Sequence, residues 1–504
     1  MAIFVRRQPG RRPQGMPQLA EYASLAALAI VVLGCVQFVI GGPASFSLFD
    51  GPVALVMVSD LVTSTLALLV AFIGWIVIRY SRTYLDGEAQ EGLFHALMLG
   101  TLAAVLLFVQ SGSLAILIIS TVLVGVGLRR LLLFYGDRPE ARRAATKFSL
   151  VWHGADVALL AAAALLTVSY GTGDLRDIAI AAADEGLTGA GAVAIGLIVL
   201  AAVLKTAAFP LHGWLTEVME APTPVSALLH AGIINSGGVL LIALSGLVQL
   251  SPGAMAALAM IGGFTALFGA AVMLTQSAVK TSLAWSTVSQ MGFLLLQCGL
   301  GLWPLALLHI VAHSLYKAHA FLSSGGAIQA VAGLRRPGPI AVPRVGAVLK
   351  SFALALALYG VIAVAFTAFL GPKTAQALAL GAILIFGVAY LVAQGLADLA
   401  PAALTKRTAL ASLGAAIAYF TFQAAAQAIW GPALPAAPTP GPLEWALIVL
   451  AVASFGLVAF AQALFPLWAH HPSMVGLRVH LANGFYLNAL LDRAIGGFRK
   501  AKMN

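Results

Sequence analysis

Two lysines lie inside long apolar segments, where a charged side chain is costly. Lys205 lies near the end of one segment, and Lys317 lies in the middle of another, LHIVAHSLYKAHAFL. A charge at the centre of a membrane helix costs about 2.5–3.5 kcal/mol even on the most lenient scale, so such groups usually line an ion pathway. A desolvated lysine can give up its proton near neutral pH. We therefore predict that both lysines take part in moving protons across the membrane.

Two histidines precede the second lysine at helical spacing. His309, His313 and Lys317 follow one another at i, i+4 and i+8, which places them on one helix face, about 6 Å apart along the axis. Histidine titrates near neutral pH, so a water-bridged row of these groups can pass a proton in steps. The two histidines could also bind zinc, but the glutamate of HExxH and a third ligand are missing. We predict no metal site.

Other ionisable residues in apolar segments are candidates for the same path. His230 lies in VSALLHAG, and His153 and Asp156 form an i, i+3 pair. Asp156 could be the counter-charge that tunes the proton affinity of a neighbour, and a purely structural His–Asp pair is the alternative. Asp60 is placed in the second apolar run.

Prolines interrupt the chain directly after Lys205. The following stretch, TAAFPLHGWLTEVMEAPTPVSALLH, contains Pro210, Glu217, Pro222 and Pro224, and proline ends or kinks a helix. Irregular backbone at membrane depth persists only inside protein or beside a wet cavity. A discontinuous helix beside an ionisable group is typical of ion-transport sites, although prolines also interrupt purely structural membrane helices. We predict a discontinuous helix near residues 205–222.

The composition places these residues in a membrane protein. Of 504 residues, 61% are hydrophobic and 9% are charged, whereas soluble domains carry about 25% charged residues. We predict an all-α integral membrane protein with about fourteen transmembrane helices, each formed by an apolar run near the ~20 residues that a span needs. The runs cover residues 19–40, 52–78, 93–110, 113–134, 147–169, 189–209, 222–247, 254–275, 281–300, 302–331, 347–370, 374–395, 408–430 and 443–468.

The basic residues predict the orientation of these spans. With the N-terminus in the cytoplasm, all but four of the 28 lysines and arginines fall on the cytoplasmic side, Lys147 among them. Arg176 and Lys373 fall outside, and Lys205 and Lys317 lie within spans. This asymmetry is an orientation signal. The net charge of +10 therefore does not imply a nucleic-acid partner.

The chain divides into three predicted parts. Residues 1–18 form a basic cytoplasmic N-terminal segment, residues 19–468 a transmembrane domain, and residues 469–504 an amphipathic cytoplasmic tail that lies on the membrane or docks a partner. Both termini are thus predicted in the cytoplasm. Cys35 and Cys298 lie in apolar helices and cannot build an iron–sulfur or zinc site, so we expect no cofactor in this chain.

Three blocks resemble the antiporter-like subunits of respiratory complex I and of Mrp-type antiporters. They are the stretch that begins at Lys205 and ends in VSALLHAG, LAWSTVSQMGF (283–293) and HIVAHSLYKAHAFLSSG (309–325), in the family's order. The resemblance implies that the two lysines belong to a proton path, together with His230, His309, His313 and Asp156. It also implies two inverted five-helix repeats.

Some family features are missing. The stretch Val124-Gly-Val-Gly-Leu128 lacks the glutamate that pairs with the first lysine, and residues 347–375 lack a second broken helix. The family's first helix and long lateral C-terminal helix also have no counterpart. The pattern is most similar to a shorter branch, the membrane subunits of DAB-type inorganic carbon accumulation complexes, through Ile233-Ile-Asn-Ser-Gly-Gly238 and NGFYLNALLDR (483–493).

This resemblance implies a transporter subunit of the bacterial inner membrane rather than an enzyme. Such a subunit moves protons or sodium ions, contacts membrane lipids, and energises CO2/bicarbonate accumulation with a soluble carbonic-anhydrase-like partner on the cytoplasmic side. Zinc is expected in that partner. Alternatives are a proton-pumping subunit of a quinone-reducing respiratory complex, an Mrp-type cation/proton antiporter, and a non-conducting scaffold for a soluble enzyme.

Overall fold

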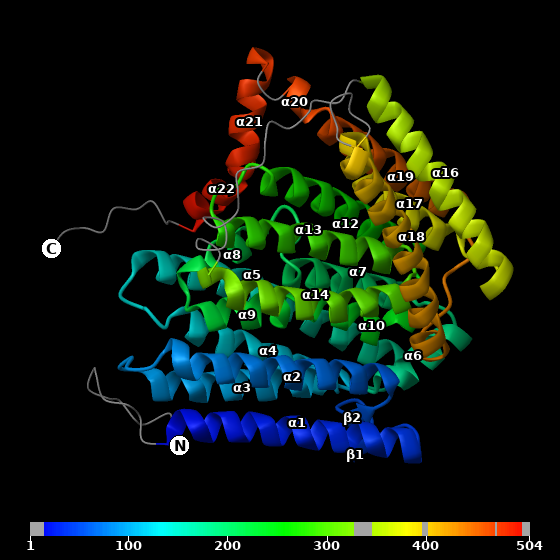
Figure 1. Cartoon of the computed structure of the whole chain (residues 1–504). Helices are drawn as coiled ribbons and strands as arrows, with labels where there is room; N and C mark the ends of the chain where they lie inside the picture. The colour runs from blue at the N-terminus through cyan, green and yellow to red at the C-terminus, as the bar shows by residue number, and fades with distance from the viewer. Residues whose placement is uncertain (1–14, 327–344, 396–401, 469–470, 496–504) are drawn as a thin grey trace.

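The computed structural model describes residues 15–326, 345–395, 402–468 and 471–495, most of which are helical (Figure 1). Most of the predicted N-terminal segment and parts of the predicted tail lie outside the described residues. The long helices are α1 (Met16–Gly41), α2 (Leu61–Tyr84), α3 (Glu91–Val109), α4 (Leu114–Leu132), α5 (Pro139–Tyr170), α7 (Gly189–Lys205), α12 (Pro252–Met273), α13 (Val279–Gly299), α14 (Trp303–Ser323), α16 (Val345–Leu370), α17 (Ala375–Gly395), α18 (Ala402–Trp430) and α19 (Pro442–Ala463). The short helices are α6 (Leu175–Asp184), α8 (Gly213–Thr216), α9 (Thr223–Ala231), α10 (Ser236–Ala243), α11 (Ser245–Val248), α20 (Phe465–Trp468), α21 (Val475–Ala482) and α22 (Leu487–Ala494).

The helices up to α14 lie side by side, with their axes running in similar directions (Figure 1). Helix α1 forms one edge of this bundle, and α16 to α19 gather at the edge away from it. Within that second group, α17 packs against α16, α18 and α19. The described end of the chain returns to the bundle, where α22 contacts α8.

The predicted number of spans is supported in part. Each of the fourteen apolar runs contains helix, but ten stretches of the described residues are long and apolar enough to cross a membrane: nine of the long helices and the stretch Thr223–Ala243, which joins α9 and α10. Helix α7 and the described part of α17 are shorter apolar helices, and α13 and α18 lie outside the set of ten. Helix α13 is less apolar because it carries hydroxyl and amide side chains, whose role is described below. The predicted inverted repeats stay a prediction.

A β-hairpin corrects the prediction for the second run. Strands β1 (Ala44–Phe49) and β2 (Leu55–Ser59) pair antiparallel, so α2 begins only at Leu61. Asp60 is the residue before the helix, and its carboxylate accepts a hydrogen bond from the backbone of Thr63 at 2.8 Å. The prediction that Asp60 lies within a span was wrong, because aspartate is a favoured N-cap.

The predicted discontinuous helix is confirmed. Helix α7 ends at Lys205, one helical turn follows at Gly213–Thr216, and helix resumes at Thr223. Pro222 is the N-cap of α9, and Pro224 lies in its first turn, where a missing N–H leaves no unmade bond. A second interruption, over residues 232–235 between α9 and α10, was not predicted. Helix α16 runs without a break, as expected for this chain.

Glycines bring α12 and α13 into close contact. A Cβ added to Gly262 would lie 2.4 Å from the backbone nitrogen of Leu296, and one added to Gly292 would lie 2.4 Å from the backbone nitrogen of Ala266. Small residues allow membrane helices to approach this closely, which increases their van der Waals contact. The pair therefore forms a rigid support for the side chains that α13 presents.

We expect Gly262→Ala to destabilise the protein by about 1–3 kcal/mol, because the added methyl group overpacks this contact. The matched control is Gly263→Ala, since a Cβ there meets nothing within 4 Å and alanine favours helix. Thermal unfolding in detergent, followed by tryptophan fluorescence, measures both. Equal midpoints for the two variants would contradict the close packing.

Candidate functional site

Lys205 and Asp156 form a buried ion pair between α7 and α5. The ammonium of Lys205 donates to Asp156 Oδ1 at 2.6 Å, and the lysine side chain is fully buried. Lys205 is the last residue of α7, next to the carbonyl end of the helix. That end carries partial negative charge, which favours a cation. The broken helix thus ends where a buried ammonium is best stabilised.

His153 and Trp152 complete this first group. His153 Nδ1 lies 3.1 Å from the other Asp156 oxygen, and the His153 side chain is 41% exposed. The Lys205 ammonium lies 3.9 Å from the centroid of the Trp152 ring, a cation–π geometry. Asp156 therefore links a fully buried lysine to a histidine that reaches the protein surface.

The first group has no acid from α4, in agreement with the sequence. Val124, at the position of the missing glutamate, is a buried apolar residue. A Cβ added to neighbouring Gly125 would lie 2.5 Å from Trp152, so the glycine lets α4 approach that ring. The indole of Trp152 donates to the carbonyl of Thr121, also on α4, at 3.0 Å. Helix α4 thus positions Trp152, and Asp156 supplies the charge.

His230 and His313 form a second group around α13. His230 Nδ1 lies 3.1 Å from the hydroxyl of Thr287, and its ring stacks on Phe321. His313 Nε2 lies 3.1 Å from the backbone carbonyl of His230, and its Nδ1 lies 2.5 Å from Gln290 Oε1. The contact between His313 and the backbone of His230 therefore connects α14 to the discontinuous helix.

His309 and Lys317 continue this group along α14, as the spacing predicts. His309 Nδ1 lies 2.8 Å from Gln297 Oε1, and the rings of His309 and His313 lie 5.9 Å apart. The fully buried Lys317 ammonium donates to the Leu283 carbonyl at 3.0 Å and to the hydroxyl of Ser286. In the described part of the chain, no group of three His, Cys, Asp or Glu residues could hold a metal ion.

The polar partners on α13 were not predicted individually. Ser286, Thr287, Gln290 and Gln297 each contact a histidine or lysine of the second group. A signal was present, because positions 286, 290 and 297 lie close to one face of a helix. Hydroxyl and amide residues on one face of an otherwise apolar helix indicate buried polar partners.

Glu217 of the interrupted segment has a partner that the sequence did not predict. Its Oε1 accepts a hydrogen bond from the ammonium of Lys147 at 2.6 Å, and the Lys147 side chain is fully buried. The distribution of basic residues assigns Lys147 to the cytoplasmic side, and that assignment stays a prediction. Burial of its side chain was not predicted, and it follows because α5 begins eight residues before Lys147, at Pro139, and carries this lysine into the protein.

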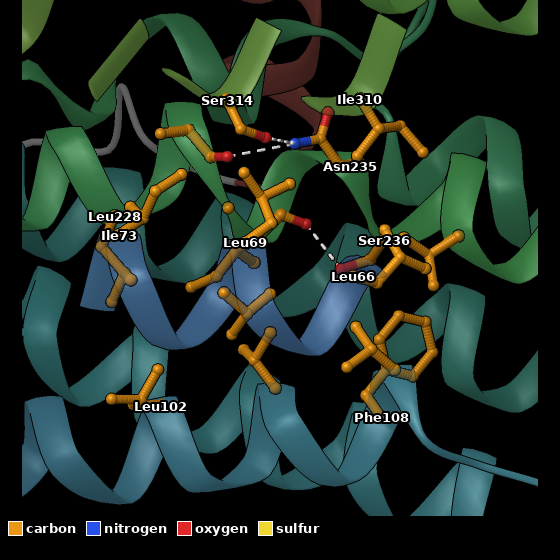
Figure 2. Close-up of a pocket in the computed structure, with 17 residues that line it drawn as sticks. Leu66, Leu69, Ile73, Leu102, Phe108, Leu228, Asn235, Ser236, Ile310 and Ser314 are labelled. Carbon is orange, nitrogen blue, oxygen red and sulfur yellow. Dashed lines mark hydrogen bonds between the residues drawn. The ribbon is translucent and has the colours of Figure 1, made fainter. Parts of the chain in front are cut away.

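Among the described residues, no hydrogen bond joins the first group to the second. The second interruption of the helix places Asn235 at the second group, where its amide donates to the hydroxyl of Ser314 at 3.0 Å. Figure 2 shows Asn235, Ser236 and Ser314 at a cavity of about 30 Å³ that is otherwise lined by apolar side chains, among them those of α2 and α3. A cavity of this size beside polar atoms has room for a water molecule.

The comparisons with known proteins agree with the residue patterns. Residues 111–341, which include every predicted site residue except the rejected candidate Asp60, match the family described as NADH:quinone oxidoreductase/Mrp antiporter, TM. The chain is 38% identical to the probable inorganic carbon transporter subunit DabB2 of Halothiobacillus neapolitanus, over 98% of this chain and 90% of that protein. This chain belongs to the DabB-type inorganic carbon transporter subunits.

Two further matches concern the sequence and the fold of this DabB-type subunit. The probable inorganic carbon transporter subunit DabB of Hydrogenovibrio crunogenus is 44% identical over 52% of this chain, which spans about half of that relative (51%). The Mrp complex from Dietzia sp. contains a chain that superimposes with a TM-score of 0.60 at 22% identity, covering 97% of this chain and 60% of that one. The shared architecture is that of a multi-pass membrane protein.

We expect Asp156→Ala to destabilise this DabB-type subunit by about 3–5 kcal/mol, because it leaves a buried lysine without its counter-charge. The double variant Asp156→Ala/Lys205→Met removes both charges and should regain most of the lost stability. Thermal midpoints of the purified protein in detergent check this prediction. A double variant as unstable as Asp156→Ala alone would show that the pair is not coupled.

Proposed function

We propose that this subunit translocates protons across the membrane and that the proton flow energises inorganic carbon accumulation. The observation that carries the proposal is the complete burial of Lys205 and Lys317 in a membrane protein. Each lysine is held by protein groups at hydrogen-bonding distance. Ionisable residues in such positions are expensive to keep and usually serve ion transport.

In the proposed path, the two groups have different roles. Asp156 holds the proton of Lys205 by direct charge pairing at 2.6 Å and offers its second oxygen to His153. Lys317 has dipolar partners, a carbonyl and a hydroxyl, so it can release a proton without leaving an unpaired carboxylate. His309 and His313 pass the proton along α14, with Gln297 and Gln290 fixing the orientation of their rings.

The chemistry of the path favours protons over sodium ions. Its central groups are the nitrogen atoms of two lysines and of the histidines in both groups, and each of these nitrogens can bind and release a proton. A sodium ion requires several oxygen ligands around one position, in the way that backbone carbonyls coordinate it in transporters. In the second group, the side-chain oxygens of Ser286, Gln290 and Gln297 instead face nitrogen partners.

We further propose a soluble, zinc-containing, carbonic-anhydrase-like partner on the cytoplasmic side of the bacterial inner membrane, with both termini of this chain on that side. The resemblance to DAB-type complexes supports the partner. The Halothiobacillus relative is named a transporter subunit, which supports the proposal that this chain is part of a complex. In this arrangement the partner hydrates CO2, and this chain supplies the proton flow that makes accumulation unidirectional.

We expect Lys205→Ala and Lys317→Ala each to abolish inorganic carbon accumulation, because each removes a proton carrier, while the complex still assembles. The measurement is uptake of radiolabelled inorganic carbon by cells that express the subunit with its native partner. The matched control is Lys373→Ala, since Lys373 lies between α16 and α17 and outside both groups. A scaffold that does not conduct ions predicts normal uptake in all three variants, and that result would overturn the proposal.

The partner is tested by purification from the native cell in a mild detergent. We expect a soluble protein that co-purifies with this chain, contains zinc by metal analysis, and hydrates CO2. Recovery of flavin and iron–sulfur subunits instead would assign the chain to a quinone-reducing respiratory complex. The proton path would then serve a redox motor, and the proposed role in carbon accumulation would be wrong.

A further inference from the structure

A third lysine is buried as completely as the two lysines of the proposed path. The ammonium of Lys147 donates to Glu217 Oε1 at 2.6 Å and to Asn488 Oδ1 at 2.7 Å, and Asp492 Oδ1 lies 2.6 Å from the same nitrogen. These side chains come from α5, from the segment after α8, and from α22 near the end of the chain. We call Lys147, Glu217, Asn488 and Asp492 the tail cluster.

The tail cluster contains more acid than base. Two carboxylates face one ammonium, and neither carboxylate has a second ion-pair partner among the described residues. The side chain of Asp492 is 9% exposed and that of Glu217 is 20% exposed. With all three groups ionised, the cluster holds one uncompensated negative charge. Such a charge is costly where the side chains are largely shielded from water. Binding of one cation removes that cost.

A proton fits this position better than a metal ion. The Lys147 ammonium already occupies the space between the oxygens, at 2.6–2.7 Å from three of them. Glu217 Oε2 is buried, and it has no hydrogen-bond partner within the described ranges. A proton on that oxygen neutralises the cluster without displacing the lysine.

We propose that the tail cluster is a proton-binding site on the same helix, α5, as the first group of the path, and that the C-terminal segment 484–494 completes it. The ligand is a proton taken from bulk water. This inference rests on the proposed function, because a proton bound here needs a path to enter. It adds a site that involves Lys147 and two residues from the end of the chain.

The C-terminal segment is seated closely on the interrupted helix. A Cβ added to Gly484 would lie 3.1 Å from Trp285, and one added to Gly213 would lie 2.1 Å from Asn488 Oδ1. Phe485 packs against Phe268 of α12. Phe485 also has a left-handed backbone, with φ of 52°, a conformation that non-glycine residues adopt only when surrounding contacts hold them there. Figure 1 shows α22 beside α8, as these contacts require.

Other charged residues lie on the same elements as the tail cluster, and among the described residues none of them forms an ion pair with it. Arg143 lies one helical turn before Lys147 on α5, and Arg493 follows Asp492 on the exposed side of α22. Glu220, in the same interrupted segment as Glu217, pairs with Arg138 at 3.2 Å near the surface. Glu220 therefore resembles Glu217 in chemistry and position but lies outside the cluster.

A continuous set of aromatic contacts leads from the tail cluster to Lys205. Phe148, next to Lys147, contacts Trp152 and Trp214 at ring separations of 5.2 and 5.4 Å. Trp152 in turn faces the Lys205 ammonium. Asp156 lies nine positions after Lys147 on α5, about 13 Å along the helix axis. The tail cluster is thus a separate site, with apolar rings between it and the first group of the path.

The test removes each carboxylate while keeping its shape. Glu217→Gln and Asp492→Asn retain the side-chain volume and one acceptor oxygen for Lys147 but lose the proton-binding group. We expect each to reduce inorganic carbon accumulation at least tenfold in cells that express the subunit with its native partner. The matched control Glu220→Gln should keep wild-type uptake. The variant Asp492→Glu, which has a carboxylate at the same position, should retain more uptake than Asp492→Asn.

Trypsin cleavage at Arg478 and Arg493 in the purified complex reports whether the C-terminal segment stays docked. We expect wild-type cleavage rates in both amide variants. Faster cleavage together with lost uptake would make the carboxylates structural, and would overturn the inference. Wild-type uptake in both amide variants, with Lys205→Ala inactive in the same cells, would overturn it and leave the proposed path intact. Normal uptake in Lys205→Ala would instead refute the path itself.

Discussion

An ammonium group buried in an apolar interior is stable only beside a counter-charge or hydrogen-bonding dipoles of the protein. The ion pair between Lys205 and Asp156 meets this requirement, and the helices around it are arranged accordingly. It explains why α7 ends at Lys205, because the carbonyl end of a helix favours a cation. It also explains the close approach of α4, since Gly125 gives Trp152 room to cover the ammonium. The end of α7 therefore stabilises the ammonium, and the prolines that follow account for the interruption.

In the second group, polar side chains of α13 meet the same requirement, and they lower the mean hydropathy of that helix. Ser286, Gln290 and Gln297 supply the oxygens that Lys317 and two histidines need. These residues make α13 less apolar than its neighbours, although it is as long as a membrane span. Close packing against α12 through glycine compensates, because it shields the polar helix with another helix instead of lipid.

Local patterns in the sequence predicted the elements and most of the site. The prolines at 210, 222 and 224 predicted the interruption, and the spacing of residues 309, 313 and 317 predicted one helix face. Both follow from rules that act within a few residues. The second interruption at 232–235 has no proline and was missed. The partners of Lys147 were missed for a different reason: Asn488 lies 341 residues further along the chain, and no local pattern reports such a contact.

The three buried lysines differ in the charge that surrounds them, and this difference sets the resting charge of each site on the proposed path. Lys147 faces two carboxylates, Lys205 faces one, and Lys317 faces dipoles without a carboxylate. With lysines and carboxylates ionised and histidines neutral, the three sites carry formal charges of −1, 0 and +1. Uptake of a proton at the tail cluster and release of a proton from Lys317 bring both outer sites to neutrality. Transfer of a proton from the tail cluster to Lys317 then restores both buried charges, which a low-dielectric interior opposes. The arrangement of acids around these lysines therefore sets the charge that each site holds at rest, and the direction of net proton flow depends on an external driving force.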